Sequence, residues 1–327
     1  MASAESVAAV IEAGGAHVPG MLERLEARLA EVAASHGPVL GEHAGATISA
    51  GGKRLRPLLV FVAAGPPADG VGAGLLRAAV AVELIHSATL VHDDVLDGAH
   101  LRRGRPTVVA VAGRGMATAT GDLLFSRAFS ELAANGSPEQ IRVLSSASSA
   151  LAEGELMQRA DAWNAATTRA RYLARCDLKT ARLFQAACEL GALEGGGPVE
   201  LLGRFGRRIG LAFQLLDDVL DVSGPAARTG KHRGTDLLDG TVTLPLIIAR
   251  RRDPALRDLD LREVVTDPVQ AAAVCDQITL SGALSEARAE ALAYVAQAKA
   301  LLGGMELPGR RREALDLVAD GVVERYA

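Results

Sequence analysis

The stretch that most constrains the fold of this chain runs from Val71 to Asp97. Its middle part, residues 78–90, is apolar nearly all the way round a helical projection, and its charge is concentrated at its end. A helix that is apolar on every side has to be surrounded by protein, so this segment belongs at the centre of a large helical bundle. The rest of the chain must therefore provide the helices that surround it.

The remaining sequence is also helical in pattern. Alanine, leucine, glutamate and arginine recur in long blocks, with apolar positions three or four residues apart, whereas strand signals are nearly absent. The expected helices cover residues 18–35, 38–49, 57–64, 71–97, 114–134, 137–160, 167–193, 197–222, 236–252, 267–280, 282–303 and 309–325. No linker or composition shift divides the chain, so we expect an all-α fold with a single domain over residues 1–327.

Composition excludes several classes of protein. A net charge of -4 and a pI near 6.0 argue against broad nucleic-acid binding, which needs a basic surface. The first fifteen residues do not resemble a signal peptide, and no uncharged apolar stretch approaches the roughly 20 residues that span a bilayer. Three cysteines form neither close zinc-binding pairs nor an even disulfide set. We therefore expect a cytoplasmic protein whose membrane contact, if any, is peripheral.

Two clusters share the pattern Asp-Asp-x-x-Asp, namely Asp93/Asp94/Asp97 and Asp217/Asp218/Asp221. On a helix the outer two aspartates of each cluster share a face and can converge on one ion, while the middle one is turned about 100° away. Like charges at this spacing destabilise a helix unless a cation neutralises them. Mg²⁺ prefers carboxylate oxygens and often bridges them to substrate phosphates. One copy alone would be equally well explained as a solvated helix end, but two copies predict a magnesium-diphosphate site.

A basic segment, Gly51-Gly52-Lys53-Arg54-Leu55-Arg56-Pro57, provides the opposite charge. Its glycines end one helix, and Pro57 suits the first turn of the next. We expect its three basic side chains to surround exposed backbone N–H groups at a positive helix end, which favours diphosphate binding. A solvated charge run is the alternative interpretation.

These residues resemble the trans-isoprenyl diphosphate synthase family, also called polyprenyl synthetases. The matching motifs occur in the family's order along nearly the whole chain. They are the basic segment 51–57, Glu83-Leu84-Ile85-His86, the first Asp cluster with Arg102-Arg103-Gly104, Gly121-Asp122, Gly154-Glu155 with Gln158, Lys179-Thr180, Phe213-Gln214 with the second Asp cluster, and Gly230-Lys231 to Leu244-Pro245.

The resemblance implies a homodimer of helical bundles, each built around a deep central cavity with the two Asp clusters facing each other across its mouth. It implies three Mg²⁺ ions bound through Asp93, Asp97 and Asp217, with Asp94 and Asp221 as further candidate ligands. Allylic diphosphate would bind Arg102, Lys179 and Lys231. Isopentenyl diphosphate would bind Lys53, Arg56, His86 and Arg103. Thr180 and Gln214 would orient dipoles toward the allylic cation.

One position departs from the family pattern. Many relatives carry a second lysine in the segment that is written here Asp239-Gly240-Thr241-Val242-Thr243. This chain has Thr241 instead, so the resemblance implies one cation fewer for the allylic diphosphate, and no binding role passes to Thr241.

The length of the product can be argued from the turns of the helix that precedes Asp93. Each turn descends about 5.4 Å, close to one isoprene unit laid along the cavity. Short-chain relatives typically have a bulky aromatic residue four or five positions before the first aspartate, whereas this chain has Thr89 and Ala88 there, with Ile85 at the next turn. We therefore expect a long product, roughly C30 to C50. A short- or medium-chain farnesyl or geranylgeranyl diphosphate synthase is the alternative.

Three other classes of protein are less consistent with these motifs. A class I terpene cyclase normally lacks the isopentenyl diphosphate pocket, and a head-to-head synthase is disfavoured by the same features. A non-catalytic partner subunit usually loses part of an Asp cluster, but both clusters are complete here.

Overall fold

The computed structural model describes residues 4–35, 37–49, 52–102, 104–224 and 233–324. Its N-terminal half contains α1 (Ala4–Gly14), α2 (His17–Ala34), α3 (Gly37–Ser49), α4 (Leu55–Ala64), α5 (Ala73–Asp97), β1 (Leu101–Arg102), β2 (Arg105–Pro106), α6 (Val108–Ala133) and α7 (Pro138–Ala160). Its C-terminal half contains α8 (Arg169–Cys176), the π-helical turn η1 (Asp177–Ala181), α9 (Arg182–Gly195), α10 (Val199–Ser223), α12 (Thr235–Leu238), α13 (Leu244–Arg252), α14 (Pro254–Arg257), α15 (Leu261–Val264), α16 (Pro268–Leu280), α17 (Ala283–Gly303) and α18 (Gly309–Glu324). The only described sheet is the two-stranded antiparallel pair β1–β2. The predicted all-α fold is therefore confirmed.

Helix α5 occupies the central position that its sequence predicts. It packs along α6 and also contacts α2, α4, α7 and α9, and residues 78–85 are all buried. By length and hydropathy α5 is the one described helix that could cross a membrane, but 67% of its most apolar window is buried inside the bundle. Its hydrophobicity is explained by the neighbouring helices.

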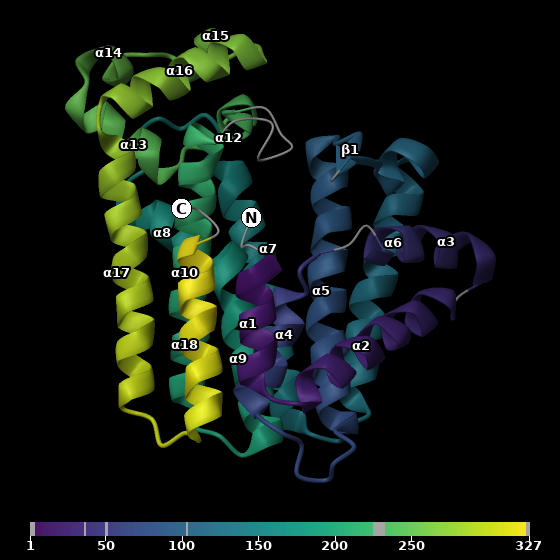
Figure 1. Cartoon of the computed structure of the whole chain (residues 1–327). Coiled ribbons are helices and arrows are strands. Elements are labelled where there is room, and N and C mark those ends of the chain that lie inside the picture. The colour runs from purple at the N-terminus through teal and green to yellow at the C-terminus, as the bar shows by residue number, and fades with distance from the viewer. Residues whose placement is uncertain (1–3, 36, 50–51, 103, 225–232, 325–327) are drawn as a thin grey trace.

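The C-terminal half packs around α10. This helix contacts α9 and α17 along much of its length, and α9 in turn packs on α4 and α7. The first and last helices, α1 and α18, lie side by side at the front of the view (Figure 1). One cluster of buried apolar side chains runs from Val10 in α1 to Val322 in α18.

The observed helices differ from the prediction at α1 and in three predicted segments. Helix α1 was not predicted, because it packs chiefly against α18 from the other end of the chain, where Val10 is buried and Val7 is partly buried. The predicted helix 236–252 is broken, since Gly240 has a φ of 69° and Pro245 lies in the first turn of α13. The predicted helix 167–193 is interrupted by η1. Helix α6 begins before residue 114, where the Thr107 side chain accepts a hydrogen bond from the N–H of Ala110.

Candidate active site

The first Asp cluster lies in the last turns of α5. The middle aspartate, Asp94, is buried and accepts a 2.8 Å hydrogen bond from Nε of Arg102 on β1. The outer residue Asp97 accepts a hydrogen bond from Arg159 of α7. Burial raises the pKa of Asp93 to about 6, although Lys179 acts in the opposite direction. The middle aspartate is thus engaged by the protein, while Asp93 is held where its charge is costly.

The second cluster lies near the end of α10, and its middle aspartate is again held by hydrogen bonds from the protein. Middle Asp218 is buried and accepts hydrogen bonds from the Tyr172 hydroxyl at 2.6 Å and from Nε2 of Gln214 at 2.7 Å. The outer residue Asp221 accepts a weaker bond from the backbone N–H of Asp236 in α12. Burial raises the pKa of both Asp218 and Asp221, and repulsion by Asp236 and Asp217 adds to the effect.

The π-helical turn η1 connects the two clusters. Nζ of Lys179 lies 2.5 Å from Oε2 of Glu155 and near enough to Asp93 to lower its pKa. The next residue, Thr180, donates a 2.6 Å hydrogen bond to Oε1 of Gln214, which is itself bonded to Asp218. A π-helical turn inserts an extra residue into a helix and so changes which side chains share a face. Adjacent residues of η1 thereby serve opposite clusters.

Two glycines allow α7 and α10 to approach η1 closely. A Cβ atom on Gly154 of α7 would lie 2.5 Å from the backbone N of Lys179. A Cβ atom on Gly210 of α10 would lie 2.6 Å from the Cα of Ala181. Side chains larger than hydrogen at these positions would push the helices away from the turn that carries Lys179 and Thr180.

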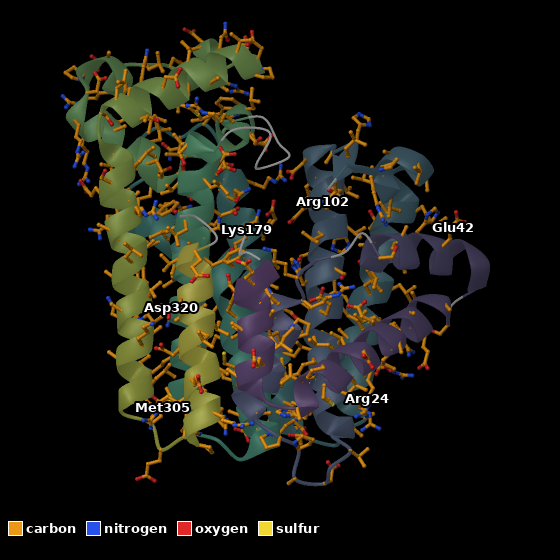
Figure 2. All side chains as sticks on the ribbon, viewed as in Figure 1. Arg24, Glu42, Arg102, Lys179, Met305 and Asp320 are labelled. Atoms are coloured by element: carbon orange, nitrogen blue, oxygen red, sulfur yellow. The ribbon has the colours of Figure 1, made fainter. Side chains whose placement is uncertain are left out.

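Arg102 and Lys179 both lie in the upper part of the bundle in the view, Lys179 near the centre and Arg102 to its right (Figure 2). Arg102 follows α5 on β1, and Lys179 lies on η1 between α8 and α9. Their closest described partners are carboxylates, Asp94 for Arg102 and Glu155 for Lys179. Both cations therefore lie among the acidic groups that would hold metal ions.

The three basic side chains of segment 51–57 do not all lie as predicted. Lys53 is exposed, and the Arg56 guanidinium lies 4.7 Å from the centroid of the Phe184 ring. Arg54 was expected to help seat a diphosphate, and this part of the prediction is wrong. Its guanidinium is held by Glu83 at 2.6 Å, by both carboxylate oxygens of Glu26, and by the Ile48 carbonyl. Arg54 instead holds the turn before α4 against Glu83 of α5.

We expect Arg54→Met to destabilise the fold. The substitution leaves the carboxylate of Glu83, which is 4% exposed, without its cation. Removing one partner of a buried ion pair costs about 3–5 kcal/mol. Urea denaturation measures the loss, and Glu26→Gln is the matched control, because Glu26 is half-exposed and its pair should contribute less than about 1 kcal/mol. Equal losses in the two variants would show that Glu83 is not the dominant partner.

The other predicted residues are placed as follows. His86 is partly buried on α5 and its carbonyl accepts a hydrogen bond from Thr89. The chain-length candidates Ile85 and Ala88 are completely buried, whereas Thr89 is partly exposed. Arg103 and Lys231 lie outside the described residues, so their predicted roles remain predictions.

Three residues near the site, Arg159, Tyr172 and Asp236, are absent from the predicted set, and Glu155 is present there only as part of a family motif with no assigned role. Glu155 and Arg159 had a recognisable signal, since they are four residues apart on α7 and pair at 2.8 Å. Tyr172 and Asp236 reach the second cluster from other elements, and no local pattern indicates their proximity.

The donor set fits a divalent cation. Around the second cluster, Asp217, Asp218, Asp221 and Asp236 repel one another, and a cation would relieve that repulsion. Among the residues that the structure describes, no three His, Cys, Asp or Glu side chains are close enough to form a complete chelate by themselves. Mg²⁺ commonly binds through one or two carboxylates and takes its other ligands from water and substrate phosphates. The outer aspartates would supply one or two carboxylate ligands, and a bound diphosphate and water would supply the others.

Comparison with known proteins identifies the family. The sequence profile described as Polyprenyl synthetase matches residues 38–279, which include both Asp clusters and η1. The chain belongs to the polyprenyl synthetase family. Within this family, heptaprenyl diphosphate synthase component 2 of Geobacillus stearothermophilus is 38% identical over 289 residues, covering 88% of this chain and 90% of the relative.

Two solved structures of relatives have the same fold. A decaprenyl diphosphate synthase from Rhodobacter capsulatus superposes with a TM-score of 0.87 at 35% identity, covering 95% of this chain and 98% of the relative. A polyprenyl synthase from Caulobacter crescentus, described as complexed with calcium and isoprenyl diphosphate, gives a TM-score of 0.88 at 34% identity and covers 97% and 98% of the two chains. These likenesses extend over almost the entire length of this polyprenyl synthetase.

Proposed function

We propose that this polyprenyl synthetase condenses isopentenyl diphosphate with an allylic diphosphate, head to tail and in the trans configuration, and repeats the step to a long-chain product. The observation that carries the proposal is η1, whose adjacent residues Lys179 and Thr180 reach the first and second Asp clusters respectively. That arrangement puts a diphosphate-binding cation and a cation-facing dipole next to each other. The length and fold shared with prenyl diphosphate synthases support the same activity.

Metal ions would be held by the outer aspartates of both clusters. We assign Asp93, Asp97 and Asp217 to three Mg²⁺ ions, and Asp94 and Asp221 remain further candidate ligands. Asp94 already accepts a hydrogen bond from Arg102, so we rank it below Asp93 and Asp97. Bound Mg²⁺ would stabilise the negative charge that develops on the departing diphosphate.

The allylic diphosphate would be held by Arg102, Lys179 and Lys231. Lys179 forms an ion pair with Glu155. To bind the diphosphate, Lys179 has to leave this carboxylate or contact both groups, because the diphosphate brings a second negative charge to the same ammonium group. Isopentenyl diphosphate would lie against Lys53, Arg56, His86 and Arg103. Arg54 would keep the first two of these in register with α5 through its bonds to Glu83.

The reaction follows from these positions. Cations around the diphosphate favour heterolysis of the allylic carbon–oxygen bond, and the bonding electrons leave with the diphosphate. The double bond of isopentenyl diphosphate then attacks the allylic carbocation. Loss of a proton from the adduct, which the released diphosphate can accept, gives a chain that is one isoprene unit longer. Thr180 and Gln214 would direct oxygen dipoles toward the carbocation.

We infer a product of roughly C30 to C50 from the helical ruler on α5. The described residues of α5 before Asp93 include no aromatic side chain besides His86 and His92. The names of the Geobacillus and Rhodobacter relatives, heptaprenyl and decaprenyl diphosphate synthase, agree with a long chain. A farnesyl or geranylgeranyl diphosphate synthase remains the second candidate, and a class I terpene cyclase is less well supported.

We further propose that residues 1–327 act as one domain, which a single buried cluster from α1 to α18 supports. The working form would be a cytoplasmic homodimer that makes at most peripheral membrane contact when it releases product. All three cysteines are buried and free, which agrees with a reducing compartment. Light scattering on the purified chain would give its mass and contradict the dimer if it equals that of one protomer.

A product assay tests the proposed function. Purified protein is incubated with Mg²⁺, isopentenyl diphosphate and each allylic primer from C5 to C20, and the dephosphorylated products are sized. We expect a ladder that ends at a long chain and disappears when the metal is chelated. Cyclic hydrocarbon without chain growth would favour a terpene cyclase. Because the Geobacillus relative is named as a component, absence of any product from this chain alone would instead indicate that a second subunit is required.

A further inference from the structure

One continuous series of hydrogen bonds runs from Tyr172 through Asp218 and Gln214 to Thr180. It begins at Tyr172, which has no predicted role. The hydroxyl of Tyr172 in α8 donates to Oδ2 of Asp218 at 2.6 Å, and Nε2 of Gln214 donates to Oδ1 of the same carboxylate at 2.7 Å. Thr180 then donates its hydroxyl proton to Oε1 of Gln214 at 2.6 Å. Tyr172 is completely buried, and Asp218 and Thr180 are nearly so.

The series has a fixed direction. When Asp218 is ionised, its carboxylate only accepts hydrogen bonds, so the amide of Gln214 has to present its N–H group to Asp218. The opposite amide orientation would place two acceptor oxygens against each other. Gln214 Oε1 must therefore face Thr180, and the single hydroxyl proton of Thr180 must point at it. The lone pairs of Thr180 Oγ1 are consequently turned away from Gln214.

Tyr172 completes this arrangement because it holds the second oxygen of Asp218. Without the Tyr172 hydroxyl, one buried carboxylate oxygen would lose its described donor, and the carboxylate could rotate about its Cβ–Cγ bond. Rotation would weaken its bond to Gln214 and release the amide orientation on which Thr180 depends. A buried hydrogen bond to a charged group contributes more than a neutral one, so the constraint is a strong one.

We propose that Tyr172 is a positioning residue for the ionisation step: through Asp218 and Gln214 it orients the Thr180 hydroxyl so that oxygen lone pairs face the developing allylic carbocation. This inference rests on the proposed prenyl transfer. A dipole that is oriented before the reaction stabilises developing charge without reorganisation at the moment of bond breaking. Tyr172 thus acts on the rate of ionisation and leaves the binding of either diphosphate unaffected.

The test compares Tyr172→Phe, which removes a single oxygen atom, with Tyr294→Phe as the matched control. Tyr294 is half-buried on α17, where it lies against Arg208. We expect Tyr172→Phe to lower kcat about tenfold or more, with the KM for isopentenyl diphosphate unchanged. Binding of an allylic thiolodiphosphate, which resists ionisation, should stay within twofold of wild type. Tyr294→Phe should change none of these values.

A double-mutant cycle tests the route through Thr180. Thr180→Val removes the hydroxyl but keeps the shape of the side chain, and Thr180→Ser should restore most of the rate. If Tyr172 acts through Thr180, adding Tyr172→Phe to Thr180→Val should lower kcat by less than about threefold further, because the dipole is already absent. Multiplied losses in the double variant would overturn the proposal. So would a kcat for Tyr172→Phe within twofold of wild type, or a loss of analogue binding as large as the loss of kcat.

These outcomes are separate from the failure of the proposed function. If the wild-type chain forms no elongated product in the same assay, the proposed activity of this chain without a second subunit is contradicted. If wild type elongates and Tyr172→Phe behaves like Tyr294→Phe, only the positioning role is lost.

Discussion

Replacing Asp217 by Ala should reduce turnover at least about a hundredfold, and Asp93→Ala should have a comparable effect. Both residues are proposed to hold metal ions whose stabilising effect is greatest as the diphosphate departs, so the loss should appear mainly in kcat. The measurement is steady-state elongation with saturating isopentenyl diphosphate and a fixed allylic primer. Near-normal turnover in either variant would contradict a metal site shared by the two clusters.

Stability separates this prediction from a general loss of structure. Asp217 raises the pKa of Asp218 and Asp221 by repulsion, so its removal should leave the unfolding temperature unchanged or slightly higher. Asp258→Ala is the matched control, because Asp258 is exposed between α14 and α15. The control should retain full activity. A large drop in unfolding temperature for Asp217→Ala would show that the carboxylate supports the fold and would weaken its assignment as a ligand.

Introducing Phe at position 89 should shorten the product by several isoprene units. Thr89 lies one helical turn before Asp93, so an aromatic ring there would obstruct the chain soon after it enters the bundle. The products are sized after dephosphorylation, as in the wild-type assay. Ala88→Phe should also shorten the product. Ala88 is completely buried, however, and overpacking a core position lowers the free energy of unfolding by about 1–3 kcal/mol.

Thr89→Phe is therefore the more decisive of the two variants. Its matched control is Thr279→Phe on α16, because both threonines bond their hydroxyl to a carbonyl of the preceding turn. Thr279 is exposed and belongs to a helix that does not carry the site, so its variant should give products of wild-type length. Unchanged product length in both the Thr89 and the Ala88 variants would show that this face of α5 does not limit the chain.

Much of the site was predictable because its signals are local. The outer aspartates share a helical face at a spacing of four residues, and this spacing indicates a cation wherever the helix lies. The apolar middle of α5 indicates a central helix for a similar reason, since a surface of that kind has to be covered. Long-range contacts carried no such signal. Helix α1 is the clearest example, because it is stabilised by α18 from the opposite end of the chain.

The sequence by itself determined the all-α class, the central place of α5, the two acidic clusters and the membership of a prenyl diphosphate synthase family. Each of these depends on residue type and on spacing along one helix. Only the tertiary structure decided which charges face each other. It assigned Arg54 to Glu83 rather than to a ligand, gave the middle aspartates Asp94 and Asp218 to protein partners, and brought Tyr172 to the second cluster. The physical reason is that ion pairs and hydrogen bonds depend on distances of about 3 Å between side chains, which helices distant in sequence set only when they pack.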